Sequence, residues 1–293
     1  MIDGALLLDK PLGITSNAAL QAAKRIYRAG KAGHAGTLDP LASGLLLVLF
    51  GEATKFAGPL LDADKEYFAT VRLGERTATA DAEGPVLQKR EISFSKDRLQ
   101  SVLERFRGEI EQVPPMHSAL KHEGTPLYRL ARRGEEVERA PRRVRIAELQ
   151  LLQRDAESLD LRVVCSKGTY IRVLAEDIGE ALGCGAHLSA LRRTASGGFR
   201  IEDAIALQAL QEASSEQRAR RLLPLGRLVE GLPSAQLAAA EEARLRQGQA
   251  LKISGLHPGL CALLRPDGAV IGLGTAEGDS LKPLRLTQAH PSG

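Results

Sequence analysis

The sequence predicts a protein of the α/β (α+β) class with a small β-rich domain at its C-terminal end. Segments with the 3.6-residue apolar spacing of helices alternate with short strand-like segments over most of the chain. Beyond about Gly231 the pattern changes to short strands separated by Gly, Pro and Asp-Gly turns. The 293 residues also suit about two domains. We therefore expect one domain over residues 1–230 and a second over 231–293.

The first half of the chain predicts alternating strands and helices. Thr15 or Ser16 can cap a helix that runs to about Tyr27. The other expected elements are an apolar strand at Ala5–Leu8, a glycine-rich loop at Gly30–Gly36, a buried strand at Leu45–Leu49, a short helix around Thr54–Leu61, a half-buried strand at Tyr67–Leu73 and a helix over Leu99–Phe106.

The second half contains the best-defined helix of the chain. Apolar residues of Thr169–Leu182 follow the i, i+3, i+4, i+7 pattern, and Gly183 is a C-terminal stop. The other expected elements are strands at Val144–Leu152 and Leu159–Cys165, then a helix at Ala238–Gln247 and strands at Leu260–Leu264, Ala269–Leu273 and Leu284–Thr287 in the second domain.

A long insertion at about residues 114–143 interrupts this regular pattern. It is rich in Pro, Gly and Arg, with one short helical pattern at Leu127–Arg133. Seven Arg and three Glu give the overlapping stretch Arg129–Arg145 a charge of +4, which equals the net charge of the whole chain. A phosphate-binding surface and an ordinary solvated face both fit this charge. Loops of this length in compact domains usually serve binding, so we expect a binding element.

Composition excludes several classes of protein. No apolar run approaches the roughly 20 residues of a membrane-spanning helix, and the first residues lack a basic segment typical of a signal peptide, so we expect a cytoplasmic protein without a membrane partner. The three cysteines are odd in number and far apart, which argues against a disulfide framework and a metal site. With 3% aromatic residues and no Trp, an RNA-binding sheet that stacks bases on several rings is not expected.

The segment Gly33–Lys55 is the densest candidate for chemistry. Asp39 is the only acid between Asp9 and Glu52, within a run of apolar and small residues, and Asp39-Pro40 fixes a turn. Asp39 is either a turn former or a catalytic carboxylate in a dry site, and His34 is either a local hydrogen bonder or a functional group; spacing alone leaves both open. The segment lacks the lysine placement of a phosphate-binding P-loop.

Three further residues stand out without a decisive pattern. Tyr170 and Arg172 lie at the start of the strong helix, off its apolar stripe, so they face either a cleft or solvent. Tyr67 opens a strand, where tyrosine commonly serves packing.

Several blocks of sequence, taken in order, resemble the TruB family of tRNA pseudouridine synthases. The resemblance spans about residues 5–200, and the tail after Gly231 resembles the small PUA-type domain of bacterial members. The blocks are DKPLGITS (9–16), GHAGTLDPLASGLLLVLFGEATK (33–55), KEYFATVRLGERTATADAEG (65–84), PPMHSALKHEGTPLYRLARRG (114–134), CSKGTYIRVLAEDIG (165–179) and GAHLSALRRT (185–194).

The resemblance implies the pseudouridine synthase fold, with a mixed, largely antiparallel sheet, and an isomerase that converts uridine 55 in the T loop of elongator tRNAs to pseudouridine by base flipping. It implies no cofactor and no metal. It makes Asp39 the catalytic residue, through ring addition, attack at the anomeric carbon or a glycal route. Substrate-binding roles fall on His34 (the T loop), Tyr67 (the flipped base), Tyr170, Arg172 (which pairs with Asp39), Leu191 (a pocket wall) and Lys10.

The resemblance also implies partners and one departure. The insertion corresponds to a family loop that closes on the T loop, and the C-terminal domain is expected to reach the acceptor stem of tRNA, with the protein a monomer. His117 stands where many relatives have a tyrosine. A tRNA folding chaperone that grips the T arm without essential chemistry remains the alternative to an active synthase.

Overall fold

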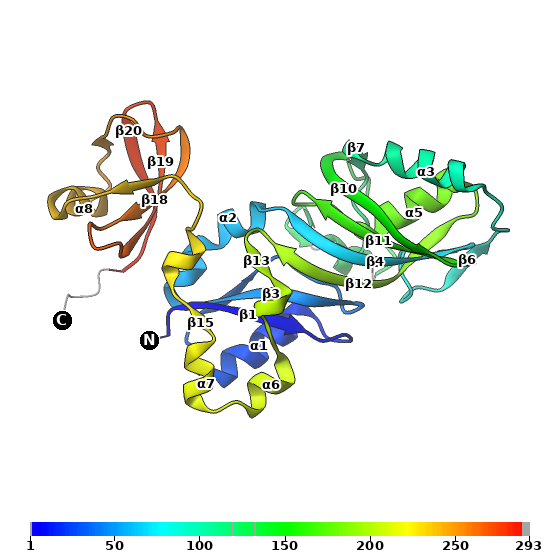
Figure 1. The fold of residues 1–293 in the computed structure, drawn as a ribbon, viewed down its shortest axis with the longest axis horizontal. Helices are drawn as coiled ribbons and strands as arrows, with labels where there is room; N and C mark the ends of the chain where they lie inside the picture. Colours follow the sequence, from blue (N-terminus) through cyan, green and yellow to red (C-terminus); the bar gives the residue numbers. More distant parts are fainter. Residues whose placement is uncertain (1, 119, 132, 289–293) are drawn as a thin grey trace.

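A large central sheet organises most of the molecule (Figure 1). The computed structural model describes residues 2–118, 120–131 and 133–288. In these residues the sheet has eleven strands, with the main order β14-β1-β3-β12-β4-β11-β10-β7; β2, β13 and β15 pair with β3, β12 and β1. The strands are β1 (Gly4–Lys10), β2 (Ala32–Ala35), β3 (Ala42–Phe50), β4 (Lys65–Leu73), β7 (Gly108–Gln112), β10 (Arg142–Arg154), β11 (Ser158–Cys165), β12 (Ala186–Ser196), β13 (Phe199–Arg200), β14 (Ile205–Ala206) and β15 (Leu222–Leu223).

The sheet is mixed and mostly antiparallel, as the sequence predicted. Among its described strands, β3–β12 and β1–β14 are parallel pairs and the other pairs are antiparallel. β3 is nearly all buried because it lies in the middle of the sheet between two core clusters.

Helices cover the sheet in two groups (Figure 1). α3 (Lys96–Arg105) and α5 (Ile171–Leu182) pack against β4, β11 and β12, and α1 (Ser16–Ile26) packs against β1 and β3. The Thr15 hydroxyl accepts a hydrogen bond from the Ala18 amide at 3.1 Å and caps α1, as predicted. The remaining helices of this part are η1 (Gly51–Phe56), α2 (Ala57–Asp62), η2 (Ile201–Asp203), α6 (Leu207–Glu212), α7 (Ser215–Arg220) and η3 (Leu225–Leu228).

The sequence analysis did not predict six short or irregular strands of this sheet, namely β2, β7, β12, β13, β14 and β15. The expected loop at Gly30–Gly36 contains the short strand β2. Its small residues show no strand pattern, and it forms by antiparallel pairing with β3. β12 had no predicted strand at all. Its composition favours helix, and register shifts at Leu188/Ala190 and Arg193/Ala195 break the two-residue alternation by which strands are recognised.

The insertion carries little regular structure. It contains β8 (Lys121–His122), β9 (Thr125–Pro126) and α4 (Leu127–Ala131), which is shorter than the helix predicted to Arg133. Another hairpin that the sequence analysis missed, β5 (Glu75–Thr77) with β6 (Val86–Lys89), lies outside the central sheet.

A β-rich C-terminal domain follows, as the turn-rich sequence predicted, and forms a separate lobe in Figure 1. Its described strands form one sheet in the order β16-β18-β19-β20-β17. Ala262 and Leu273 of this sheet share a core cluster with Ala53 and Phe56 of η1, so the lobe rests on the first domain. Its elements are β16 (Ser234–Gln236), α8 (Ala239–Arg246), β17 (Leu251–Lys252), β18 (Gly259–Leu264), β19 (Val270–Glu277) and β20 (Ser280–Leu286).

The three cysteines lie inside these cores. Cys165, Cys184 and Cys261 are buried and free, in agreement with the expectation that they form no disulfide framework. No helix of the described residues is long and apolar enough to cross a membrane.

Candidate active site

A cavity of about 630 Å³ brings together five of the seven residues that the sequence analysis singled out. Asp39 lines it from the connection between β2 and β3, and the other residues come from β4, α5 and its N-cap, and β12. Segments as far apart in the sequence as those of Asp39 and Leu191 thus meet at one site. The five residues are Asp39, Tyr67, Tyr170, Arg172 and Leu191.

The Asp39 loop, which we define as residues 36–41, is held by backbone contacts on the side of α1. The Ser16 hydroxyl lies 2.7 Å from the Leu38 amide, from which it accepts, and 2.9 Å from the Leu38 carbonyl, to which it donates. The Gly13 amide donates to the Pro40 carbonyl at 2.9 Å. The Ala42 amide closes the turn on the Asp39 carbonyl at 3.0 Å. The backbone around Asp39 is therefore held by groups at and before the start of α1 and by its own turn.

Arg172 links Asp39 to a second, buried aspartate. Its Nε lies 3.0 Å from Asp39 Oδ2, and its Nη1 lies 3.4 Å from Asp81 Oδ2. The side chains of Arg172 and Asp81 are 6% and 3% exposed, whereas that of Asp39 is 42% exposed. The guanidinium also donates to the carbonyls of Thr79 and His117, at 3.3 and 2.7 Å. Arg172 thus orients a carboxylate that remains open to the cavity.

The walls of the cavity suit a flat, uncharged ring. Burial raises the pKa of Tyr67 and of Tyr170, so both phenols stay protonated at neutral pH. Leu191 is partly buried and packs against the core cluster beneath. Two aromatic rings and an aliphatic side chain beside a carboxylate give room to stack a base next to a group able to act on it.

His34 lies on a neighbouring cavity of about 570 Å³ that shares Asp39 and Arg172 with the first. Burial is the main cause that lowers the pKa of His34, so the imidazole is neutral at pH 7. His117 lines both cavities. Asp39 therefore forms part of the wall between two openings, one lined by Tyr67 and the other by His34.

Lys10 lies inside the protein and does not line either cavity. Its ammonium donates to the carbonyls of Pro11 and Ile14, at 2.9 and 2.7 Å. Burial lowers the pKa of Lys10 to about 8. Lys10 supports the turn whose Gly13 amide contacts the Asp39 loop.

The sequence analysis did not single out Asp81 or Arg193. Asp81 sits in a turn-rich stretch where an acid is unremarkable, and only the fold brings it to Arg172. Arg193, which also lines the cavity of Tyr67, is 1% exposed; an arginine in a segment with no strand pattern gave no sign of burial.

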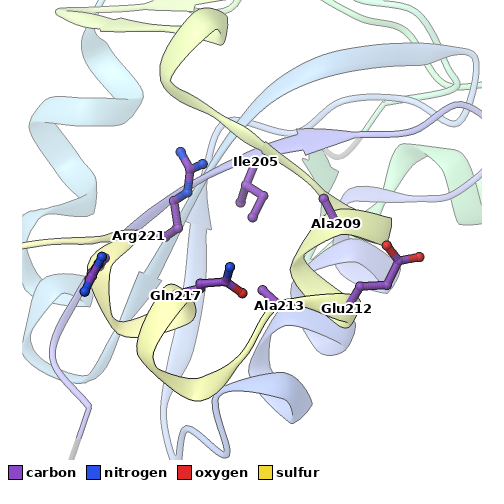
Figure 2. A pocket seen from close by; sticks show the side chains of 7 residues that line it. Ile205, Ala209, Glu212, Ala213, Gln217 and Arg221 are labelled. Carbon is purple, nitrogen blue, oxygen red and sulfur yellow. The ribbon is translucent and has the colours of Figure 1, made fainter.

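A third pocket, of about 570 Å³, lies between α6 and α7 and the end of β14 (Figure 2). Its apolar floor of Ile205 and two alanines is bordered by Glu212, Gln217 and two arginines. It shares no lining residue with the two cavities at Asp39. Among the described residues, no group of His, Cys, Asp and Glu has the arrangement of a metal site.

Comparison with known protein families identifies the family of the chain. Residues 24–171 match the model of the N-terminal domain of TruB family pseudouridylate synthases, and residues 172–230 match that of the C-terminal domain of tRNA pseudouridylate synthase B. Together the two matches cover more than half of the chain. The chain belongs to the TruB family. The junction of the two matches, at Arg172, falls inside α5 and is not a boundary between the two lobes of the structure.

Curated relatives share about half of their residues with this chain over nearly its whole length. The tRNA pseudouridine synthase B of Chromohalobacter salexigens is 53% identical over 97% of this chain and 94% of that protein. The protein of the same name from Burkholderia mallei is 52% identical over 97% of both.

Solved structures of similar fold include a Cbf5-Nop10-Gar1 complex, with a TM-score of 0.75, 30% identity and coverage of 98% of this chain and 84% of the other. A second is an H/ACA RNP bound to a substrate RNA containing 2'-deoxyuridine, with a TM-score of 0.74, 28% identity and coverage of 98% and 85%.

Proposed function

We propose that this protein is a tRNA pseudouridine synthase that isomerises uridine 55 in the T loop of elongator tRNAs. The observation that carries the proposal is the Asp39 carboxylate, held by Arg172 and open to a cavity walled by Tyr67 and Leu191. Family membership and relatives named tRNA pseudouridine synthase B supply the substrate class.

The reaction breaks the bond between N1 of uracil and C1′ of ribose and forms a bond between C5 and C1′, with one proton released from C5 and one proton taken up at N1. Atoms are conserved, so no co-reactant is needed. The base must first leave the stack, which costs a few kcal/mol that contacts with the aromatic and apolar walls offset. Asp39 then acts by adding to ring carbon six, by attacking C1′ or by removing a sugar proton to give a glycal. In each route Arg172 holds the carboxylate in place.

The wider surface fits a folded RNA partner. The insertion presents Arg129, Arg133 and other arginines to solvent, and these suit contacts with phosphates of the T arm. We propose that His34 contacts the T loop from the neighbouring cavity and that residues 231–293, a PUA-like domain, reach the acceptor stem. The proposal places a monomeric protein in the cytoplasm, where its tRNA substrate is found.

The test is a map of pseudouridine in an unmodified elongator tRNA transcript, read by primer-extension stops after carbodiimide treatment. We expect one new stop, at position 55, and none in a transcript with cytidine at that position. Stops elsewhere would contradict the assigned target. Tight binding without conversion would instead support the T-arm-binding chaperone.

A further inference from the structure

Arg193 lies in the middle of the sheet, between the strand that follows Asp39 and the strand that carries Tyr67. On β12 it pairs with Gly44 of β3 on one side and with Tyr67 of β4 on the other. Its side chain is among the largest fully buried ones, at 1% exposure. It therefore touches both the strand that follows the Asp39 loop and the strand that carries Tyr67.

The guanidinium of Arg193 bonds to the backbone on both sides of Asp39, at the start of the Asp39 loop and in β3. Its Nη2 donates to the Gly36 carbonyl at 3.0 Å, and its Nε donates to the Leu45 carbonyl at 2.7 Å. Gly36 precedes Asp39 and Leu45 follows it. On the other side, Arg193 pairs with Tyr67 of β4, and its positive charge lowers the pKa of the Tyr67 hydroxyl against the larger effect of burial. One rigid, planar group thus lies between the loop that carries the carboxylate and the strand that carries the aromatic wall.

Two glycines let the loop approach Arg193 this closely. A Cβ on Gly36 would lie 3.1 Å from Arg193 Nη1, and a Cβ on Gly44 would lie 2.3 Å from the Arg193 carbonyl oxygen. Both glycines have φ near +100°, a conformation that other residues rarely adopt. The backbone on both sides of Asp39 is therefore fitted to Arg193.

The charge of Arg193 is compensated in an unusual way. Among the described residues, no carboxylate lies within ion-pair distance of it, and the carbonyls of Gly36 and Leu45 accept its hydrogen bonds. Buried arginines are normally paired with acids. Pairing with an acid would use the donors that here hold the backbone before and after Asp39.

We propose that Arg193 is a positioning residue of the synthase, which holds the Asp39 loop in place relative to Tyr67. The proposal rests on the proposed function, and Arg193 acts through the Asp39 loop and Tyr67. A displacement of about 1 Å between reacting groups can cost roughly 100-fold in rate. The loss should therefore appear in the chemical step and not in RNA affinity.

The test compares Arg193→Lys and Arg193→Met with Arg192→Met as a matched control. Arg192 is the next residue on the same strand but is 42% exposed and pairs with Asp9 at 2.7 Å. For each variant we would measure the thermal melting curve, the Kd for tRNA and the single-turnover rate with enzyme in excess. We expect a rate loss of about 100-fold for Arg193→Met and about 10-fold for Arg193→Lys, with Kd within about twofold of wild type. The control should retain the wild-type rate.

A double-mutant cycle separates positioning from a purely structural role. In a Tyr67→Phe background the Tyr67 hydroxyl is gone, so Arg193→Lys should cost clearly less than it costs in the wild type. Folded Arg193 variants with the wild-type rate would overturn the proposal. So would losses that only follow the unfolded fraction, or losses that simply multiply in the double mutant. An inactive wild type in the same assay would count against the proposed function itself.

Discussion

The Asp39 loop and the insertion form walls of the same cavity but are held in opposite ways. The loop is fixed by buried groups from other elements, among them the hydroxyl of Ser16 and the guanidinium of Arg193. The insertion makes mostly local hydrogen bonds, such as that from the Tyr128 amide to the Ser118 carbonyl. It contacts the wall that carries Asp39 where Arg172 donates to the His117 carbonyl.

We expect this difference to assign the chemical step to the Asp39 loop and RNA binding to the insertion. Groups that stabilise a transition state act best when they are preorganised, because no energy is then spent on orienting them during the reaction. A segment with few buried contacts opens at little cost and can close around a bulky partner. We therefore expect substitutions in the loop to lower the rate and substitutions in the insertion to weaken RNA binding.

Arg172→Met should have the largest effect, because Arg172 contacts both segments. The variant should lose more than about 100-fold in single-turnover rate, since Asp39 loses its orienting cation. It should also be less stable by roughly 3–5 kcal/mol, because Asp81 is left buried without its partner. Rate measurement and urea unfolding test both effects. Arg172→Lys should recover part of the rate, and a rate for Arg172→Met within threefold of wild type would show that the contact is dispensable.

The double variant Arg129→Glu, Arg133→Glu tests the insertion. Both side chains are exposed, so we expect an unchanged melting temperature, a Kd for tRNA raised by about tenfold, and a shallower dependence of Kd on salt because fewer counterions are released. The rate at saturating enzyme should remain within about twofold of wild type. Arg105→Glu, an exposed residue of α3, is the control. A lower saturating rate with an unchanged Kd would show that the insertion serves the chemical step and not RNA binding.

A smaller effect should come from Lys10, which supports the Asp39 loop from within. Burial lowers the pKa of Lys10 from 10.5 to about 8, so the unfolded chain binds the proton more tightly than the folded protein. The contribution of this group to stability must therefore rise as pH increases from about 8 to 10.5. The difference in unfolding free energy between wild type and Lys10→Met should move in favour of wild type over this range. Urea unfolding at pH 7.5, 9 and 10.5 measures it, and parallel pH curves would contradict the burial argument.

Much of the fold was predictable because it rests on local patterns. α1 has its own N-cap at Thr15. The apolar stripe of α5 and its C-terminal stop at Gly183 could both be recognised in the sequence. β12 was not, because its bulges remove the alternation and its burial depends on the strands on either side.

The residues of the site also include some that the sequence predicted and some that it did not. Family motifs pointed to Asp39, Tyr67 and Arg172, and the structure places all three on one cavity. Asp81 and Arg193 depend on contacts between distant segments, such as Arg193 with Gly36, which no spacing along the chain encodes.

The most direct test of the account is the single-turnover formation of pseudouridine by wild type and Asp39→Asn, with tRNA binding measured on the same samples. Asparagine keeps the size of the side chain and removes the carboxylate. The account predicts conversion by the wild type and a rate at least about 1,000-fold lower in the variant, with Kd unchanged. A variant that binds tRNA normally and converts it at a rate near that of the wild type would show that Asp39 is not the catalytic group.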